Sequence, residues 1–391
     1  IGRGAKTLRE AQDMAVQALD MAQGRGGDQA AEMTPDGFTV YGGVSHGVEK
    51  RSKVRSRIVA DQLVKLIKEA DHVVIMGHRM SDLDAIGSAE GVLRICKICD
   101  VPAVIAVRRD ATLAGSLIDA LCKAGQKDDF IDPKDALPII SKKTLCIVVD
   151  TYQIGLVESR EILEKCGKVA VIDHHRKGVG YIENPVLVCH EPYSSSASEL
   201  VTELLQYVGD RDDKPNRVEA EGLLSGIMLD TQDFTLHTGV RTFEAAAALR
   251  RYGAETERVR QLFDVSMVEY AAKAELVERA QMYKNCAISV GGEIAPEARV
   301  AIAQAANDLL RIQNVDASFV AVQVGGGVNI SARSLGAVNV QVIMESLGGG
   351  GHQTMAAAQL KHITPEAARA RIEDAIDKYW ASQKKSGAGE K

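Results

Sequence analysis

The chain has 391 residues, 46% of them hydrophobic and 26% charged, which excludes extensive disorder and leaves room for two or three domains. The formal net charge of −6 argues against long nucleic acid as a partner, because such partners favour basic proteins. No apolar run approaches the ~20 residues that span a bilayer. The seven cysteines, several of them in apolar runs, are typical of reduced core residues in a cytosolic protein.

The first 45 residues predict a helix followed by a hairpin. Small and apolar side chains recur along one stripe of residues 7–23, and the segment from Arg25 to Gln29 is a turn signal. The chain starts Ile-Gly-Arg-Gly, with neither an initiator Met nor a signal-peptide pattern. We therefore interpret residues 1–45 as the end of a truncated domain, and residues 46–70, which are rich in basic side chains, as a linker helix.

Strands and helices are expected to alternate over residues 71–239, which is typical of a mostly parallel sheet covered on both faces. Residues 240–285 predict a helical connector, residues 286–384 a smaller α/β unit, and residues 385–391 a disordered tail. In the first unit the expected strands are 72–76, 101–107, 145–149 and 169–172, with later helices at 194–208 and 219–229. In the second unit the expected strands are 287–290, 317–324 and 328–332, and the expected helices are 303–312, 339–347 and 365–382.

Candidate metal ligands follow the first and third of these strands. His78, Asp82 and Asp84 lie in the loop after strand 72–76, at the carboxyl end where open α/β sheets bind ligands. A role as helix N-cap would explain Asp82, but it leaves His78 and Asp84 unexplained. Asp150 ends strand 145–149. A lone Asp at the end of a strand is usually a cap or turn residue.

The tripeptide Asp173-His174-His175 ends the fourth expected strand and is the most informative in the chain. One carboxylate and two imidazoles at the end of a buried strand are costly unless a metal or a phosphate compensates them. Adjacent histidines point in different directions, so we expect one to bind metal and the other to meet phosphate or donate a proton. Asp173 is expected to orient its neighbours.

Asp230 closes the apolar helix expected at 219–229, where a carboxylate opposes the helix dipole unless a cation lies nearby. Arg241 and Thr242 open the next helix and are candidates for substrate contact. Together the carboxylates and imidazoles suit two hard divalent ions about 3.5–4 Å apart that share a carboxylate. We expect Mn²⁺, with Mg²⁺ or Co²⁺ as substitutes. The six candidate ligands are His78, Asp82, Asp84, Asp150, His174 and Asp230.

The smaller unit contains residues suited to phosphate. Four consecutive glycines at 348–351 let backbone N–H groups approach an anion. Arg333 can grip a phosphate through two hydrogen bonds, and His352 is a candidate contact for phosphate or base. We expect the glycines to open a helix over 355–360, whose N-terminus would favour the anion. The alternative for the glycines is a flexible turn.

The order and spacing of these residues resemble the DHH phosphoesterases over residues 71 to 380. Within that family the chain most resembles the GdpP-type cyclic-di-AMP phosphodiesterases, through the segments 78–87, 191–200 and 226–234. Residues 1–45 look like the end of the degenerate GGDEF domain of such proteins. The motifs that match are Gly77-His78-x3-Asp82-x-Asp84, Asp150, Asp173-His174-His175 and Asp230, with 330–333 and 348–352 similar to the DHH-associated C-terminal domain.

The resemblance implies an α/β catalytic domain with a mostly parallel sheet, joined by the helical connector to a smaller α/β substrate-binding domain. It implies a homodimer, and a soluble cytoplasmic fragment whose parent is held at the cell membrane by segments absent from this chain. By the same resemblance, one Mn²⁺ would be held by His78, Asp82 and Asp150, and the other by Asp84, Asp150, His174 and Asp230. Catalysis would use His175 and Asp150, and the far phosphate or nucleotide would be bound by Arg333, Gly349, Gly350 and His352.

The expected reaction is hydrolysis of one phosphodiester bond of cyclic-di-AMP to linear pApA, by water that the metals activate. One alternative is an oligoribonuclease or 3′-phosphoadenosine 5′-phosphate phosphatase acting on short linear nucleotides. A manganese pyrophosphatase fits the glycine-rich phosphate site less well. A non-catalytic cyclic-dinucleotide sensor would not need six intact ligands. The sequence does not identify residues that would choose adenine over guanine.

Overall fold

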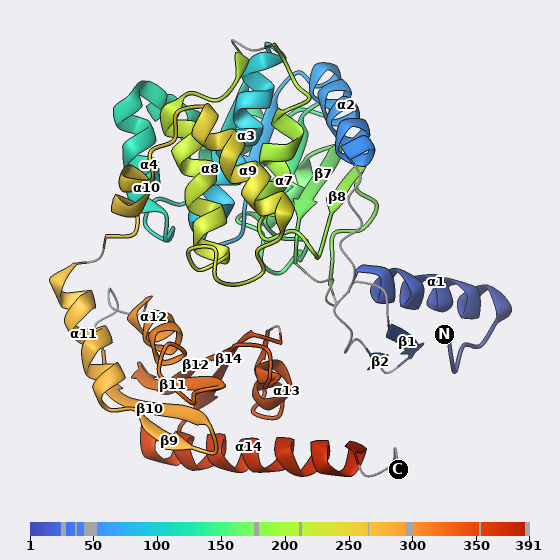
Figure 1. Cartoon of the computed structure of the whole chain (residues 1–391). Helices are drawn as coiled ribbons and strands as arrows, with labels where there is room; N and C mark the ends of the chain where they lie inside the picture. The colour runs from blue at the N-terminus through green and yellow to red at the C-terminus, as the bar shows by residue number, and fades with distance from the viewer. Residues whose placement is uncertain are drawn as a thin grey trace. The chain divides into compact units, whose positions relative to one another are not determined.

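The protein, described by a computed structural model, divides into two compact units, Ile1–Phe263 and Asp264–Lys391. The boundary falls inside the segment 240–285, which the sequence predicts as a helical connector. Each unit contains a six-stranded sheet (Figure 1). The structure describes residues 1–24, 29–35, 37–42, 53–175, 180–210, 213–264, 266–294, 300–351 and 353–387.

The first residues form the helix and hairpin that the sequence predicts. Helix α1 (Leu8–Gly24) precedes β1 (Gln29–Thr34) and β2 (Gly37–Gly42), which pair antiparallel. The predicted turn residues from Arg25 to Asp28 lie outside the described residues. The linker helix is α2 (Lys53–Glu69).

The large sheet of the first unit is parallel throughout and has the strand order β5-β4-β3-β6-β7-β8. All four predicted strands are present. The edge strands β5 and β8 were not predicted. With two residues, β5 is too short to give a periodic signal. The strands are β3 (Val73–Met76), β4 (Ala103–Ala106), β5 (Phe130–Ile131), β6 (Leu145–Val149), β7 (Lys168–Asp173) and β8 (Leu187–His190).

Helices cover both faces of this sheet, and alternate residues of each strand enter two different cores. Ile75 and Ile147 pack on one face with residues of α3, α7 and α8, whereas Met76 and Val148 pack on the other with residues of α5 and α6. Continuous apolar runs are therefore needed, as in other two-sided parallel sheets. The helices are α3 (Leu83–Ile98), α4 (Gly115–Leu121), α5 (Pro133–Ala136), α6 (Arg160–Lys165), α7 (Ala197–Leu205), α8 (Arg217–Asp230), α9 (Val240–Arg251) and α10 (Thr256–Gln261), with shorter turns η1 (Cys122–Gln126), η2 (Lys127–Asp129) and η3 (Leu137–Ile139).

The strand order reverses between β3 and β6. From β3 the chain proceeds through β4 to β5 on one side, and from β6 through β7 to β8 on the other. The carboxyl ends of β3 and β6 therefore flank a topological switch point, the place where open α/β sheets bind ligands.

The second unit contains a mixed sheet with the order β13-β14-β12-β11-β10-β9, in which only β10 and β11 pair parallel among the described strands. Helix α12 packs on one face, and α13 and α14 pack on the other. Its elements are α11 (Met267–Glu278), β9 (Gln281–Tyr283), β10 (Cys286–Glu293), α12 (Val300–Leu309), β11 (Ala317–Val324), β12 (Gly327–Ser334), α13 (Val340–Glu345), β13 (Gly350–Gly351), β14 (Met355–Lys361) and α14 (Pro365–Gly387).

The structure corrects the expectation of a helix over 355–360. This segment is strand β14, which pairs antiparallel with β12 and alternates between exposed and buried side chains. Ala356, Ala358 and Leu360 enter the core, so the pairing overrides the helix propensity of an alanine-rich run. Two smaller differences are that the predicted connector ends in strand β9, and that α14 continues to Gly387 although the tail from residue 385 was expected to be disordered.

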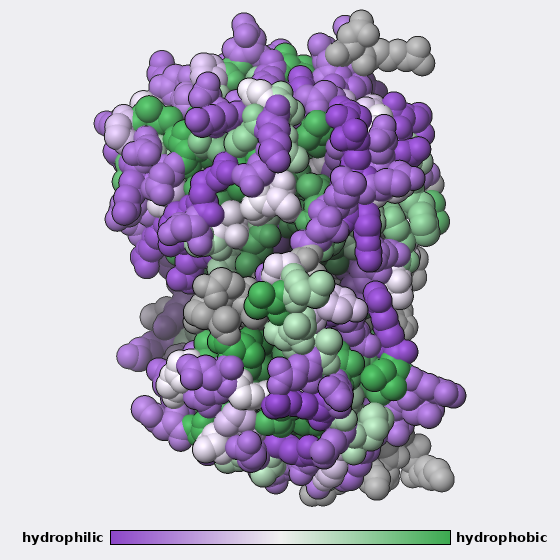
Figure 2. Space-filling model, turned by 90° about the vertical axis from the view of Figure 1, so that its left-hand side faces the viewer, coloured by the Kyte–Doolittle hydropathy of each residue, from purple (hydrophilic) through white to green (hydrophobic). Residues whose placement is uncertain are grey.

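No helix among the described residues is long and apolar enough to cross a membrane. Figure 2 shows a face of the molecule that is mostly hydrophilic, with hydrophobic side chains gathered in small groups. Such scattered exposure is ordinary for a folded protein surface.

Candidate metal centre

The candidate ligands meet at the carboxyl edge of the parallel sheet, beside the switch point. His78 lies two residues after β3, Asp150 directly follows β6, and His174 directly follows β7. Asp150 has a φ of 57°, a left-handed conformation that is uncommon for a non-glycine residue. Its N–H donates a hydrogen bond of 2.9 Å to the carbonyl of Ile172. The order of adjacent strands β3, β6 and β7 thus brings these three side chains together.

His78, Asp82 and Asp150 form the first ligand group. His78 Nε2 lies 3.4 Å from Asp150 Oδ2 and 3.8 Å from Asp82 Oδ1. Asp82 is also the N-cap of α3, where its Oδ1 accepts hydrogen bonds of 3.0 and 3.1 Å from the N–H groups of Asp84 and Ala85. A carboxylate has enough lone pairs to cap a helix and bind an ion, so both interpretations of Asp82 are compatible with its position.

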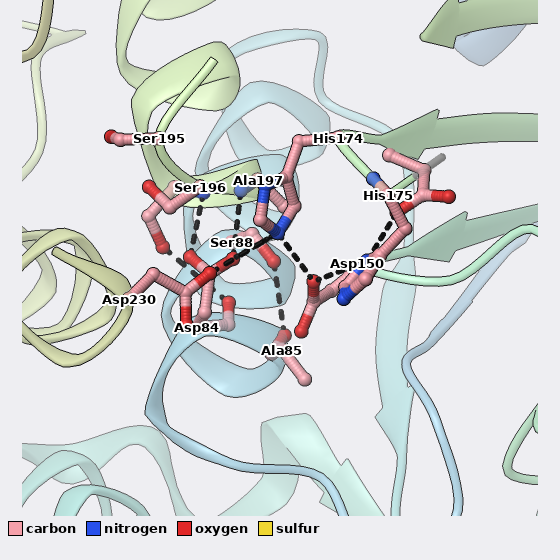
Figure 3. Close-up of polar contacts among 12 residues, drawn as sticks. Asp84, Ala85, Ser88, Asp150, His174, His175, Ser195, Ser196, Ala197 and Asp230 are labelled. Atoms are coloured by element: carbon pink, nitrogen blue, oxygen red, sulfur yellow. Dashed lines mark hydrogen bonds and ion pairs between the residues drawn. The ribbon is translucent and has the colours of Figure 1, made fainter. Parts of the chain in front are cut away.

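Asp84, Asp150, His174 and Asp230 form the second group (Figure 3). His174 Nε2 lies 3.1 Å from Asp230 Oδ2, 3.4 Å from Asp150 Oδ1 and 3.9 Å from Asp84 Oδ2. Asp84 comes from the first turn of α3 and Asp230 is the last residue of α8. All six predicted ligands therefore lie in two groups that share Asp150, whose Oδ2 faces His78 and whose Oδ1 faces His174.

Burying several carboxylates so close together is energetically unfavourable unless a cation lies among them. Burial, together with Asp150 and Asp230, raises the pKa of Asp84 well above its ordinary value. Burial opposes the charge of His78, but Asp150 and Asp82 outweigh it and raise its pKa to about 11. Within the described part of the chain, the buried atoms Asp150 Oδ1 and His174 Nε2 have no hydrogen-bond partner. Divalent ions would satisfy these atoms and neutralise the excess negative charge, so the residues fit such ions.

The two histidines of the Asp173-His174-His175 tripeptide share one partner, Asp150 Oδ1, which lies 3.4 Å from His174 Nε2 and 3.5 Å from His175 Nδ1, and these three residues form a third candidate ligand group. They differ in that His175 also contacts Asp173. Asp173 is fully buried, and its Oδ1 accepts a hydrogen bond of 3.1 Å from the His175 N–H and lies 2.9 Å from His175 Nδ1. The His175 carbonyl lies 2.5 Å from His190 Nε2. His174 therefore faces the second ligand group, while Asp173 orients His175.

Several groups that hold the candidate ligands in position were not predicted from the sequence. The backbone N–H groups of Ala197 and Ser198 donate to Asp84. The sequence predicts a helix at 194–208 and a family resemblance over 191–200, but neither indicates that these N–H groups contact a ligand. The available signal was Ser196-x-x-Glu199, a spacing typical of a helix start.

Local structure occupies the side chains of Arg241 and Thr242, and their expected contacts with substrate stay a prediction. The Arg241 guanidinium donates hydrogen bonds of 2.7 and 2.8 Å to the Glu203 carboxylate. The Thr242 hydroxyl accepts a hydrogen bond of 3.1 Å from the Gly239 N–H at the start of α9. Both residues are buried and stabilise the packing of α9.

In the second unit, Arg333 lies on β12 with little to balance its charge. Its guanidinium donates hydrogen bonds to the Ser331 hydroxyl (3.0 Å) and the Ala332 carbonyl (2.9 Å), whereas Nε is buried without a partner in the described structure. Burial lowers the pKa of Arg333 to about 10. None of the ion pairs found in the described ranges includes Arg333.

A pocket of about 440 Å³ lies near Arg333, between α12 and the strands β12 and β14. Asn329, Ser331 and Gln359 supply its polar lining, and Gly349 also lines it. A Cβ atom at Gly349 would stand 2.1 Å from the Ala357 carbonyl oxygen, so close packing on β14 already requires glycine there. Gly350 lies in β13, and the candidate His352 lies outside the described residues.

Comparisons with known proteins agree with this geometry. The model of the DHH family, N-terminal domain, matches residues 72–227, and that of the DHHA1 domain matches residues 295–382. The chain is 45% identical to the cyclic-di-AMP phosphodiesterase GdpP of Geobacillus thermodenitrificans, over 98% of this chain and 59% of that protein. This chain therefore spans about 59% of the length of that relative.

Two further proteins are similar over most of their own length. The bifunctional oligoribonuclease and PAP phosphatase NrnA of Thermus thermophilus is 26% identical, over 84% of this chain and 95% of that protein. The crystal structure of an exopolyphosphatase-related protein from Bacteroides fragilis superposes with a TM-score of 0.70 at 22% identity, over 83% of this chain and 96% of that one. This second similarity shows a shared fold.

Proposed function

This chain belongs to the DHH family, and we propose on that premise that it is a metal-dependent phosphodiesterase that hydrolyses cyclic-di-AMP to linear pApA. The observation that carries the proposal is Asp150, whose two oxygens face two different ligand groups. This arrangement suits two divalent ions bridged by one carboxylate, as in many enzymes that act at phosphorus. The choice of cyclic-di-AMP is supported by the 45% identity to a phosphodiesterase of that substrate.

The proposed ions are two Mn²⁺, with Mg²⁺ or Co²⁺ as substitutes, because the donor set is rich in carboxylate oxygens. When bound, the two ions would supply an activated water and neutralise charge on the phosphoryl oxygens. His78, Asp82 and Asp150 would hold one ion. The other ion would be held by Asp84, Asp150, His174 and Asp230.

His175 is the proposed proton donor to the phosphoryl group or the leaving 3′-oxygen. Asp173 lies against Nδ1, which favours a proton on that nitrogen and leaves Nε2 as the atom that exchanges a proton with substrate. Burial and His174 oppose the charge of His175, but Asp173 and Asp150 outweigh them and raise its pKa.

Arg333 is the proposed phosphate contact in the second unit. A largely buried guanidinium without a carboxylate partner gains from an anionic ligand, which it can bind through charge-assisted hydrogen bonds. The neighbouring pocket has a volume in the range of small-molecule sites. Gly349, Gly350 and His352 complete the proposed substrate contacts.

Separation of products by chromatography tests this proposal. We expect cyclic-di-AMP to give pApA with Mn²⁺ and to remain intact with a chelator, with slower turnover of cyclic-di-GMP. A protein that binds Mn²⁺ but leaves cyclic-di-AMP unchanged, under conditions where it cleaves no other phosphodiester, contradicts the phosphodiesterase function and favours a nucleotide sensor.

Hydrolysis of short linear nucleotides is the second candidate function. It is favoured by the similarity to the oligoribonuclease and PAP phosphatase of Thermus thermophilus, which extends over 95% of that protein. Side-by-side turnover of cyclic-di-AMP, pApA and 3′-phosphoadenosine 5′-phosphate separates the two. Faster cleavage of the linear compounds would replace cyclic-di-AMP as the proposed substrate.

The proposed setting is the cytoplasm, where the protein acts as a homodimer. The cysteines of the chain are all free thiols, five of them buried, which agrees with a reducing compartment. Light scattering at several protein concentrations measures the oligomeric state, and a mass of one chain throughout contradicts the dimer.

A further inference from the structure

The start of α7 holds Asp84, a ligand of the second group, by its backbone. Asp84 Oδ2 accepts a hydrogen bond of 2.7 Å from the Ala197 N–H, and Oδ1 accepts one of 2.8 Å from the Ser198 N–H (Figure 3). Both donors lie in the first turn of α7, where the helix dipole favours a negative charge. Each Asp84 oxygen still has a lone pair that can bind an ion. The position of this turn therefore sets the direction of those lone pairs.

Glu199 in turn holds the first turn of α7 and the serines before it. Its Oε1 accepts a hydrogen bond of 2.9 Å from the Ser194 hydroxyl. Its Oε2 accepts one of 2.5 Å from the Ser195 hydroxyl and one of 3.3 Å from the Ser195 N–H. The Glu199 N–H donates to the hydroxyl of the N-cap, Ser196, at 3.0 Å. The buried Glu199 side chain thus links two successive serines, Ser194 and Ser195, to the turn that contacts Asp84, and the Glu199 backbone links the N-cap Ser196.

Close packing prevents the Asp84 side chain from taking another position. Gly226 of α8 approaches so closely that a Cβ atom there would stand 2.6 Å from Asp84 Oδ1 and 2.3 Å from the Ser198 hydroxyl oxygen. Asp84 is therefore confined between α3, α7 and α8. A small displacement of α7 would move its two N–H donors relative to Asp84, because the packing of α3 and α8 keeps Asp84 in place.

We propose that Glu199 is a positioning residue that sets the orientation of Asp84 and thereby the affinity of the second ligand group for a divalent ion, an inference that rests on the proposed metal-dependent function. Glu199 is not itself among the described residues whose ligand atoms come within 4.8 Å of one another at the centre. It acts through the serines and the α7 amides. Groups of this kind, which orient metal ligands, typically contribute about 10–100-fold to metal affinity.

Calorimetric titration with Mn²⁺ alone tests the proposal in the whole chain. We expect wild type to bind two Mn²⁺, and Glu199→Ala to bind one of them about 10–100-fold more weakly while the other is unchanged. Glu199→Gln keeps the shape and one acceptor oxygen, so its affinity should lie between the two. An unchanged pair of affinities in Glu199→Ala overturns the proposal.

Thr202→Val is the matched control on the same helix. Thr202 is fully buried and its hydroxyl donates only a hydrogen bond of 2.7 Å to the Ser198 carbonyl one turn back. This variant should keep both Mn²⁺ affinities even if its Tm falls. If Thr202→Val weakens Mn²⁺ as much as Glu199→Ala, the effect is general loosening of α7, and the positioning role is rejected.

Ser195→Ala decides the question if Glu199→Ala does not fold. It removes one donor to Glu199 and should weaken the same Mn²⁺ site in the same direction by a smaller factor; no change rejects the proposal. Wild type that binds no Mn²⁺ would instead refute the metal-dependent function itself. The two failures are therefore distinguishable.

Discussion

The candidate metal centre of the first unit and the surroundings of Arg333 in the second unit have opposite charge. At the metal centre, carboxylates crowd a buried sheet edge, and backbone N–H groups already hold Asp82 and Asp84 in place. In the second unit, the Arg333 guanidinium is largely buried and its Nε has no hydrogen-bond partner among the described residues. Asn329 Oδ1, which belongs to the lining of the neighbouring pocket, has no partner among them either. A cation suits the first region and an anion suits the second.

The two regions are therefore suited to ligands of opposite charge. A rigid backbone frame is needed where ions must be held within tenths of an ångström, because metal affinity depends on ligand geometry. The second region uses side chains on neighbouring strands, which suits recognition of a small molecule. Substitutions in the two regions should therefore change different kinetic quantities.

Asp150→Ala should give the largest effect, because it removes a ligand from both groups at once. We expect turnover of cyclic-di-AMP to fall by at least about 10³-fold, the factor that corresponds to ~4 kcal/mol of transition-state stabilisation. Steady-state assays with Mn²⁺ measure this loss, and circular dichroism checks the fold. Asp119→Ala, at an exposed carboxylate of α4 that pairs with Arg109 at 2.6 Å, is the control and should stay within about twofold. Full activity of Asp150→Ala would contradict the ligand assignment.

Arg333→Ala should raise KM for cyclic-di-AMP by about 10–100-fold, the equivalent of the 1.5–3 kcal/mol of one hydrogen bond to a charged group. The affinity for Mn²⁺ should not change, because Arg333 belongs to the other unit. Arg369→Ala, on α14 and paired with Glu373 at 2.9 Å, is the control. An Arg333→Ala protein that loses Mn²⁺ binding while its KM is unchanged would contradict the proposal that the first unit binds metal and Arg333 binds phosphate.

Glu90→Gln should have the smallest effect, and it should change stability and not activity. It concerns a buried acid that keeps its proton, unlike the carboxylates proposed to bind ions. Glu90 is a buried acid of α3 that lies outside both ligand groups and accepts a hydrogen bond of 2.6 Å from Gln126. Burial and Glu219 raise its pKa to about 8, from 4.5 in the unfolded chain. The folded protein therefore keeps a proton that the unfolded chain loses between these values, so stability falls as pH rises through that window.

The amide in Glu90→Gln does not titrate, so the variant should gain stability over wild type only on the alkaline side. Thermal unfolding should show a Tm higher by a few degrees near pH 8.5, at about 2–4 °C per kcal/mol, and no difference near pH 4.5. Glu255→Gln is the control, because the loss of its exposed ion pair with Arg258 should change Tm little. An equal shift of Tm at both pH values contradicts a proton-linked cause.

The strands at the centre of the parallel sheet could be predicted because burial on both faces demands a continuous apolar run. Residues 145–149 were predicted as a strand and form β6 with the same bounds. The run 355–360 was misassigned because alanine suits helices locally, and only pairing with β12 makes it a strand. The two-residue strand β5 leaves no pattern that a sequence window can detect.

The side chains that gather at the candidate metal centre could be predicted from the sequence alone, because ligands placed directly after parallel strands must meet at one edge of the sheet. Tertiary structure alone decided how those side chains are held. Asp84 receives its hydrogen bonds from backbone groups 113 and 114 residues away, and backbone N–H groups are the same in every non-proline residue. It also decided that Asp150 presents one oxygen to each ligand group, since the direction of a carboxylate depends on neighbours that the folded sheet supplies.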